Sequence, residues 1–139
     1  MSVGRICARE VTVAMPDENV AVAARRMLEQ RVGTLVVLND TKQPIGLVTD
    51  RDLVLRVLAA GNEPQTTLIR DVMTRDPQVV GEDTPIESAL ALMRTGSFRR
   101  IPVVNRDGEL VGILSLDDVL ALIAEEFTHI GAVLEQQEP

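Results

Sequence analysis

Two short segments of this 139-residue chain place a hydroxyl and a carboxylate one helical turn apart. Thr49 stands three residues before Asp52, and Ser115 stands three residues before Asp118. The start of a helix offers free backbone N–H groups and a partial positive charge, which suit a phosphate, and the hydroxyl adds one more donor. A carboxylate close by can accept both hydroxyls of a ribose. The two segments therefore predict a nucleotide site.

The same residue types also start a helix without any ligand. A threonine or serine can cap the first turn while an acidic residue three positions later bonds back to the backbone of the cap. This explanation stays open for Thr49 with Asp52 and for Ser115 with Asp118. The occurrence of the pair twice, at equivalent positions, favours a site.

Both segments belong to a repeat with an offset of 66 residues, the difference between Gly46 and Gly112. Residues 46–52 (GLVTDRD) fall on residues 112–118 (GILSLDD) without an insertion. A unit of this size is too long for a solenoid repeat, and two copies are too few for one. We therefore expect two half-domains related by a pseudo-twofold axis, with the function located where they meet.

Each copy reads as strand, helix, strand, strand and helix. The first copy has helical spacing of apolar residues after Asp17, and the second has a stronger helix start, with Thr84 as the cap and Pro85 in the first turn. Short apolar runs rich in β-branched residues indicate buried strands. The predicted strands are 11–14, 35–38, 45–48, 101–104 and 110–114, and the predicted second helices are 52–60 and 118–126.

This pattern predicts a mixed α+β fold. We divide the chain into a first motif with its linker (1–66), a second motif (67–127) and a C-terminal tail (128–139), which we expect to fray from Ile130 onward. Each half is too small to bury much surface alone, so the halves must pack on each other.

The composition excludes several classes of partner. Aromatic residues make up 1% of the chain, so stacking on single-stranded nucleic acid is not expected. The net charge is −7, with 8 basic and 8 acidic residues in positions 1–66 but 6 basic and 13 acidic in 67–139. Such a field repels DNA and anionic lipid. We expect no nucleic-acid partner and no membrane insertion, since no run approaches ~20 apolar residues.

Other reactive residues are given no role. Cys7 is the single cysteine, and the repeat matches it with Met73, so a buried apolar position is favoured over a reactive thiol. The lack of a disulfide and of a signal-peptide pattern predicts a cytoplasmic protein. His129 lies in the predicted tail, far from any nucleophile.

The acidic residues at the two helix starts are not expected to hold a metal, because such charges usually sit solvated in a first turn. They are Asp50, Asp52, Asp117 and Asp118. The sequence shows no nucleophile–base pair and no glycine-rich phosphate loop, so we do not expect an enzyme.

From about Val3 to Phe127 the chain resembles the tandem cystathionine-β-synthase (CBS) domain pair, or Bateman module. The resemblance rests on the two Gly-x-x-[Thr/Ser]-x-x-Asp segments, the Asp-Val-Met-Thr lead-in at 71–74, the Phe-Arg-Arg-Ile-Pro-Val string at 98–103 and the Thr-Asp-Arg-Asp-Leu string at 49–53. It implies two pseudo-symmetric β-α-β-β-α motifs packed sheet to sheet. It also implies a sensor of AMP, ADP, ATP or S-adenosylmethionine that needs no other cofactor.

The resemblance implies one cleft on each side of the pseudo-axis. The first cleft takes Thr49 and Asp52, closed by Thr84, Arg99, Ile101 and Pro102. The second takes Ser115, Asp118 and Arg100, closed by Glu18, Gly33, Thr34 and Leu35.

The first copy departs from the family pattern in two places, which predicts clefts of unequal affinity. Its lead-in is Arg-Ile-Cys-Ala at residues 5–8, and its second strand begins Gly-Thr-Leu-Val at 33–36. We therefore do not expect two identical sites.

Two features concern assembly. The second helices, Leu53 to Ala60 and Val119 to Ala124, are apolar on more than one face, which predicts a homodimer. Modules of this family regulate an attached or separate protein, and we expect a separate, unknown one. A rival reading from another class is a ligand-independent dimerisation or partner-docking module.

Overall fold

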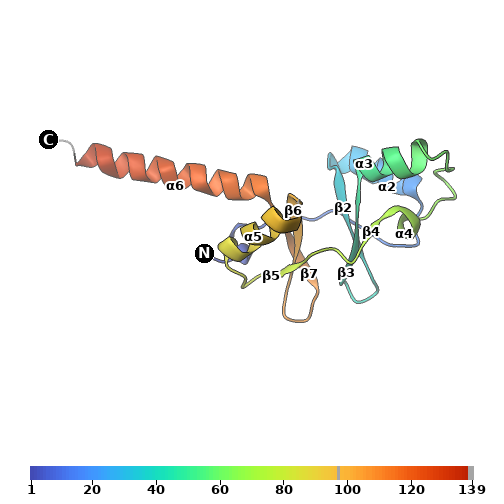
Figure 1. Cartoon of the computed structure of the whole chain (residues 1–139), viewed down its shortest axis with the longest axis horizontal. Helices are drawn as coiled ribbons and strands as arrows, with labels where there is room; N and C mark the ends of the chain where they lie inside the picture. The colour runs from blue at the N-terminus through green and yellow to red at the C-terminus, as the bar shows by residue number, and fades with distance from the viewer. Residues whose placement is uncertain (97, 138–139) are drawn as a thin grey trace.

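The computed structural model describes residues 1–96 and 98–137 and contains two small sheets at the centre of the molecule, with the longer helices outside them (Figure 1). In both sheets the first pair of strands is parallel and the other pairs are antiparallel. The predicted mixed α+β fold of two related halves is confirmed. The first sheet has the order β1 (Val13–Ala14), β2 (Thr34–Leu38), β3 (Pro44–Thr49), β4 (Thr74–Arg75), and the second has β5 (Val80–Gly81), β6 (Arg100–Val104), β7 (Leu110–Ser115).

The helices follow the same repeat, with one difference in length. The helix after β3 is short and passes into a π-helix, whereas the helix after β7 runs for 21 residues. Two four-residue helices, α1 and α4, precede the repeats and were not predicted. The helices are α1 (Val3–Ile6), α2 (Val20–Gln30), α3 (Asp50–Leu53), η1 (Val54–Leu58), α4 (Ile69–Val72), α5 (Ile86–Gly96) and α6 (Leu116–Gln136).

The 66-residue offset holds in the strand register. Thr34 pairs with Thr49 in the first sheet, and Arg100 pairs with Ser115 in the second. Val36 and Pro102 are fully buried but belong to neither of the two cores that lie under the helices. Because side chains alternate along a strand, these two residues lie on the opposite faces of their sheets, so their burial comes from the other sheet.

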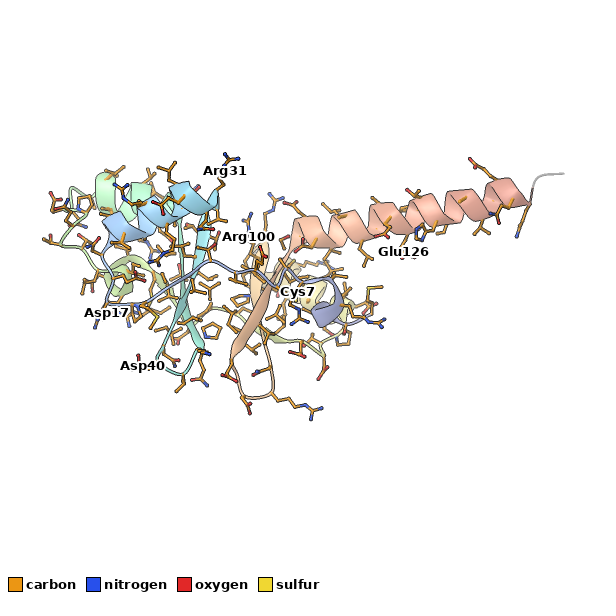
Figure 2. The ribbon with its side chains drawn as sticks, turned by 180° about the vertical axis from the view of Figure 1, so that it is seen from behind. Cys7, Asp17, Arg31, Asp40, Arg100 and Glu126 are labelled. Carbon is orange, nitrogen blue, oxygen red and sulfur yellow. The ribbon has the colours of Figure 1, made fainter. Side chains whose placement is uncertain are left out.

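The two halves exchange their lead-in segments. Val3 and Cys7, from the start of the chain, belong to the core of the second half. Ile69 and Met73, from the lead-in of the second repeat, belong to the core of the first half. Figure 2 shows Cys7 beside the strands of the second half. A division at residue 66 therefore separates sequence repeats and not packed units.

This exchange explains the glycine of the repeated segment. A Cβ added at Gly112 would lie 2.7 Å from Cys7 Sγ and 2.8 Å from the carbonyl oxygen of Ala8. A Cβ at Gly46 would overlap Met73 in the same way. Cys7 is 8% exposed, as predicted for a buried apolar position, and burial raises the pKa of its thiol. The glycines thus allow the exchanged segments to lie against β3 and β7.

Several helix ends differ from the prediction. α2 is capped by Asn19, whose side chain accepts a hydrogen bond from Val22 N at 3.0 Å, and not by Asp17. Leu28, which was assigned to its apolar face, is 76% exposed. α5 begins at Ile86, two residues after the expected Thr84 cap.

The largest difference lies at the C-terminus. The structure continues α6 to Gln136, where the sequence analysis predicted a helix that ends at residue 126 and a fraying tail. The helical spacing of its apolar residues continues past Glu126, so the segment has the pattern of one uninterrupted helix. No helix in the described part of the chain is both long and apolar enough to cross a bilayer.

Candidate functional site

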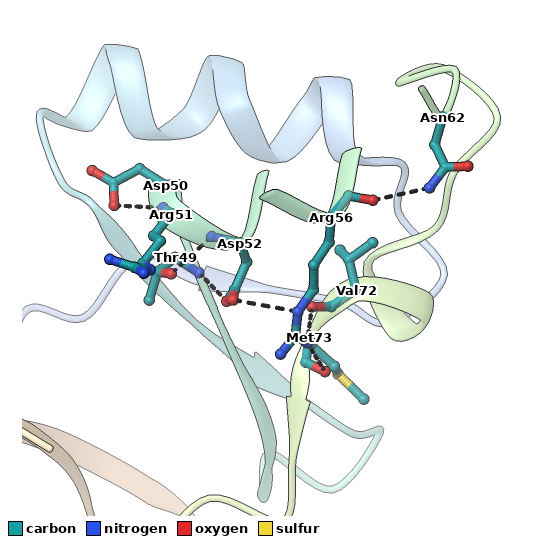
Figure 3. Close-up of polar contacts among 8 residues, drawn as sticks. All are labelled: Thr49, Asp50, Arg51, Asp52, Arg56, Asn62, Val72 and Met73. Atoms are coloured by element: carbon teal, nitrogen blue, oxygen red, sulfur yellow. Dashed lines mark hydrogen bonds and ion pairs between the residues drawn. The ribbon is translucent and has the colours of Figure 1, made fainter. Parts of the chain in front are cut away.

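The two strand-to-helix junctions have the same hydrogen bonds. Thr49 Oγ1 accepts from the backbone N–H of Asp52 at 3.2 Å, and Asp52 Oδ2 accepts from the N–H of Thr49 at 2.9 Å (Figure 3). Ser115 Oγ accepts from Asp118 N at 3.1 Å, and Asp118 Oδ2 accepts from Ser115 N at 3.2 Å. Both pairs are therefore helix caps, whatever else they do.

Arg56 ties the first junction to the exchanged segment. Its Nε lies 3.8 Å from Asp52 Oδ1, and its Nη1 donates to the carbonyl oxygen of Val72 at 2.8 Å (Figure 3). The position 66 residues later is Leu122, a partly buried side chain that packs against the second core. Only the first junction therefore has a cation beside its aspartate.

A cavity of about 490 Å³ lies between the halves, beside the first junction. This volume falls within the roughly 300–1,000 Å³ typical of small-molecule sites. Its lining joins β3 of the first half to β4, the segment after it and the start of β6. The described lining residues are Leu47, Thr49, Asp52, Thr74, Asp76, Pro77, Gln78, Phe98 and Arg100.

The chemistry of this lining is divided between polar and apolar groups. Thr49 and Asp52 supply a hydroxyl and a carboxylate, and Arg100 is the one cationic side chain among the described lining residues. Pro77 and Phe98 supply apolar surface on which a planar ring can stack. Hydroxyl, carboxylate, guanidinium and an aromatic ring are the groups that a nucleotide requires.

A second cavity, of about 240 Å³, is the pseudo-symmetric counterpart of the first. The 66-residue offset relates six of the nine described lining residues of the larger cavity to residues of the smaller one. Arg100 is replaced in this relation by Thr34, but Arg100 itself also lines the smaller cavity. Figure 2 shows Arg100 between the two halves. The smaller cavity is lined by Glu10, Val11, Thr12, Arg31, Val32, Gly33, Thr34, Arg100 and Ile113.

The structure brings together part of each predicted set. Thr49 and Asp52 line the larger cavity, and Gly33, Thr34 and Arg100 line the smaller one. Ser115 and Asp118 form the equivalent junction but are not among the lining residues of the smaller cavity.

Other predicted residues lie apart from these groups. Thr84 lines a separate hollow beside Asp83 and Arg106. Arg99 does not line the larger cavity; its guanidinium lies 3.7 Å from Asp117 Oδ1, and both side chains are exposed. The remaining three, Leu35, Ile101 and Pro102, have fully buried side chains.

Glu18 is engaged with its own half. It accepts from Arg26 at 2.6 and 3.0 Å and from the backbone N–H of Met15 at 2.7 Å. The hydrogen bond from Arg26 lowers the pKa of Glu18, and the same contact raises the pKa of Arg26. The pair lines a hollow of about 940 Å³ along α2 and residues 9–15, separate from the smaller cavity.

The sequence analysis missed residues in both cavities, and the repeat itself could have found some of them. Asp76, Pro77 and Gln78 follow β4 and line the larger cavity, while Glu10, Val11 and Thr12 stand 66 residues earlier and line the smaller one. The offset was applied to the junctions but not to these less similar stretches.

Comparison with known proteins accounts for the repeat. A family model described as the CBS domain matches the chain twice, at residues 3–59 and 69–125. The uncharacterized protein YlbB of Bacillus subtilis is 41% identical over 118 residues, covering 84% of this chain and 78% of YlbB. An uncharacterized protein of Methanopyrus kandleri is 36% identical over 120 residues, covering 86% of this chain but 61% of that protein. This chain therefore spans less than two thirds of the Methanopyrus relative.

Among solved structures, the CBS-pair protein CBSX2 from Arabidopsis thaliana is similar over nearly its whole length. It is 30% identical, with a TM-score of 0.80, covering 91% of this chain and 96% of CBSX2. CBSX2 has also been crystallised in complex with AMP; that structure has a TM-score of 0.76 and 31% identity, covering 89% of this chain and 96% of the other.

Proposed function

We propose, because this chain belongs to the CBS-domain family, that it is a regulatory module that binds an adenosine nucleotide between its two halves. The observation that carries the proposal is the cavity of about 490 Å³ beside the first junction, with Thr49, Asp52, Phe98 and Arg100 in its lining. The AMP complex of CBSX2 supports adenosine ligands as the class.

Each group in the larger cavity has a part in this proposal. Asp52 uses Oδ2 for its cap, so Oδ1, which has only the 3.8 Å ion pair with Arg56, can accept a ribose hydroxyl. The Arg100 guanidinium binds the phosphate, because a charge-assisted contact of this kind is stronger than a neutral one. Phe98 and Pro77 lie against the base.

AMP is the preferred candidate over ADP, ATP and S-adenosylmethionine. The described lining of the larger cavity contains one cation, Arg100, and two acidic side chains, Asp52 and Asp76. A single phosphate matches one guanidinium, whereas each further phosphate adds negative charge near the carboxylates. The smaller cavity, at about 240 Å³, is the weaker site, and the two clefts differ in affinity.

The module also forms a homodimer and regulates a separate protein in this proposal. Val54, Leu55 and Leu58 on η1 are exposed, and so are Leu120 and Ile123 on the equivalent part of α6. Apolar side chains that gather in this way favour a contact between copies.

A rival function, ligand-independent docking, is favoured by one observation. Thr49, Asp52, Ser115 and Asp118 all take part in capping boxes, which gives each of them a structural role without a ligand. In the rival reading the module dimerises or docks a partner and the cavities hold only water.

Thermal unfolding with AMP, ADP, ATP and S-adenosylmethionine at millimolar concentration separates the two readings. Saturation at 100 times the dissociation constant stabilises the folded state by about 2.7 kcal/mol if only that state binds. AMP should raise the Tm of the wild type and leave that of Arg100→Gln nearly unchanged. A flat Tm across all four compounds would favour the rival, and turnover of ATP would favour an enzyme.

A further inference from the structure

The long helix α6 carries a row of exposed apolar side chains that the nucleotide site does not use. The helix begins at the second junction and runs outward from the two sheets (Figure 1). Along it, the spacing alternates between three and four residues, which is typical of a helix packed lengthwise on other helices. The row consists of Leu120, Ile123, Phe127, Ile130 and Leu134, which are 43–69% exposed.

The described part of the chain offers no helix of its own to cover this row. The 21 residues of α6 span roughly 31 Å at 1.5 Å per residue. α2 and α5 have 11 residues each, and both bury one face in their own half. A cover of matching length and spacing must therefore come from another molecule.

The charges beside the row favour further copies of this chain over a basic partner helix. In a seam with this spacing, the positions that flank the distal part are Ala124, Glu126, Gly131 and Val133. Three of these four are uncharged. A partner with basic flanks would meet only Glu126, whereas a second α6 presents the same uncharged flanks.

The residue types indicate how many helices meet. Leu120 and Leu134 take the first apolar position of the heptad, and Ile123 and Ile130 take the second. Leucine at the first position with isoleucine at the second favours three or four helices over two. Val133, which is also exposed, widens the apolar row in the same direction.

We infer that four copies of this chain assemble through α6, as a pair of the homodimers proposed above. The inference rests on that homodimer, because tetramers built from twofold pairs are the next commonest symmetric assembly after dimers. The first half cannot take part in the same way, since its equivalent helix ends at Leu58. The contact therefore belongs to the second half alone.

Sedimentation equilibrium of the full chain at micromolar concentration tests the inference. The wild type should give about four times the chain mass of 15.2 kDa. The double variant Phe127→Glu, Ile130→Glu should give about twice that mass, with an unchanged Tm for the folded body. Leu28→Glu is the matched control, because Leu28 is equally exposed on α2 but lies outside the row.

Salt supplies a second readout. α6 carries five acidic and no basic residues within 116–136, so salt should screen the repulsion between copies and strengthen the tetramer. Dissociation of the tetramer by 0.5 M NaCl would overturn the inference.

Each other mass decides a different point. A wild-type dimer would overturn the α6 assembly and leave the homodimer standing, whereas a wild-type monomer would remove both. A tetramer that survives in the double variant would show that α6 is not the contact.

Discussion

The two halves share their backbone and differ in the side chains around the clefts. Both junctions have the same capping box, and both sheets have the same register. Arg100 at the start of β6 corresponds to Thr34 at the start of β2. The larger cavity measures about 490 Å³ and its counterpart about 240 Å³. A duplicated fold can thus keep its structural residues in both copies while its binding residues diverge.

The shared part of the comparison is the exchange of lead-in segments, and breaking it should have the largest effect. Gly112→Val places a side chain where Cys7 Sγ and the Ala8 carbonyl lie, at 2.7 and 2.8 Å from the new Cβ. Overpacking of this kind costs about 1–3 kcal/mol, and we expect the upper end because backbone must move. Urea unfolding followed by circular dichroism measures the loss.

The same measurement on Gly46→Val should give a similar loss, since Met73 occupies the equivalent place. Gly131→Ala is the control: nothing lies near its added Cβ, and alanine in a helix should stabilise by about 0.5–1 kcal/mol. Wild-type stability in Gly112→Val would show that the exchange does not require this glycine.

The difference at Arg100 should have the next largest effect, on binding. Arg100→Gln removes the cation of the larger cavity and should weaken AMP by tenfold or more, since a hydrogen bond to a charged group contributes about 1.5–3 kcal/mol. Arg99→Gln should change the affinity less than twofold, because Arg99 pairs with Asp117 at the surface. Calorimetry that gave equal losses for the two variants would contradict the assignment of Arg100.

The two aspartates test whether the clefts are unequal. Asp52→Asn should weaken the first AMP by about tenfold, which corresponds to 1.4 kcal/mol, whereas Asp118→Asn should leave that step nearly unchanged. Asparagine keeps an oxygen that can accept the capping N–H, so neither variant should lose much stability without ligand.

The opposite pattern has a clear meaning. If both aspartate variants unfold more easily while they bind AMP as tightly as the wild type, the carboxylates are caps only. If calorimetry finds two identical sites per chain, the inequality of the clefts is wrong.

The smallest effect concerns the Glu18–Arg26 pair, which the second half replaces by Thr84 and Leu92. The pKa of Glu18 is lowered in the folded state, so its contribution is present above the unfolded pKa of about 4.3 and is lost as the pH falls through the folded value. Glu18→Gln should cost about 0.5 kcal/mol at pH 7, the scale of partly exposed pairs.

The difference between Glu18→Gln and the wild type should shrink as the pH is lowered from 5 to 3. Urea midpoints at pH 7 and pH 3.5 measure this, with Glu87→Gln on the exposed face of α5 as the control. A difference that stays constant or grows on acidification would contradict the proposed sign.

The sequence predicted the elements that have strong local patterns. The hydroxyl–carboxylate pairs at Thr49 and Ser115 identified both junctions, because a capping box is local in sequence. The lead-in helices α1 and α4 were missed because four residues are too few to show a helical period. The end of α6 was missed because Thr128, His129 and Gly131 weaken the apolar pattern at the point where the helix leaves its own half.

The candidate site was harder to predict because it depends on how the halves meet. Arg99 and Arg100 are adjacent in sequence, and alternation along β6 sends their side chains to opposite faces. Only the structure shows that Arg100 lines both cavities while Arg99 pairs with Asp117. Glu18 was assigned by the family pattern, but the pattern does not record Arg26, eight residues later.

The exchanged lead-ins also determine when this chain can fold during synthesis. Val3 and Cys7 leave the ribosome first, yet the core that they complete includes Leu114 and Val119, which are made near the end. Contacts such as that between Arg9 and Val111 span 102 residues, and long-range contacts of this kind slow folding. The first motif likewise waits for Ile69 and Met73. The second half therefore cannot complete its core until β7 and the first turn of α6 have emerged, and a nascent chain stopped before them leaves Val3 without its core.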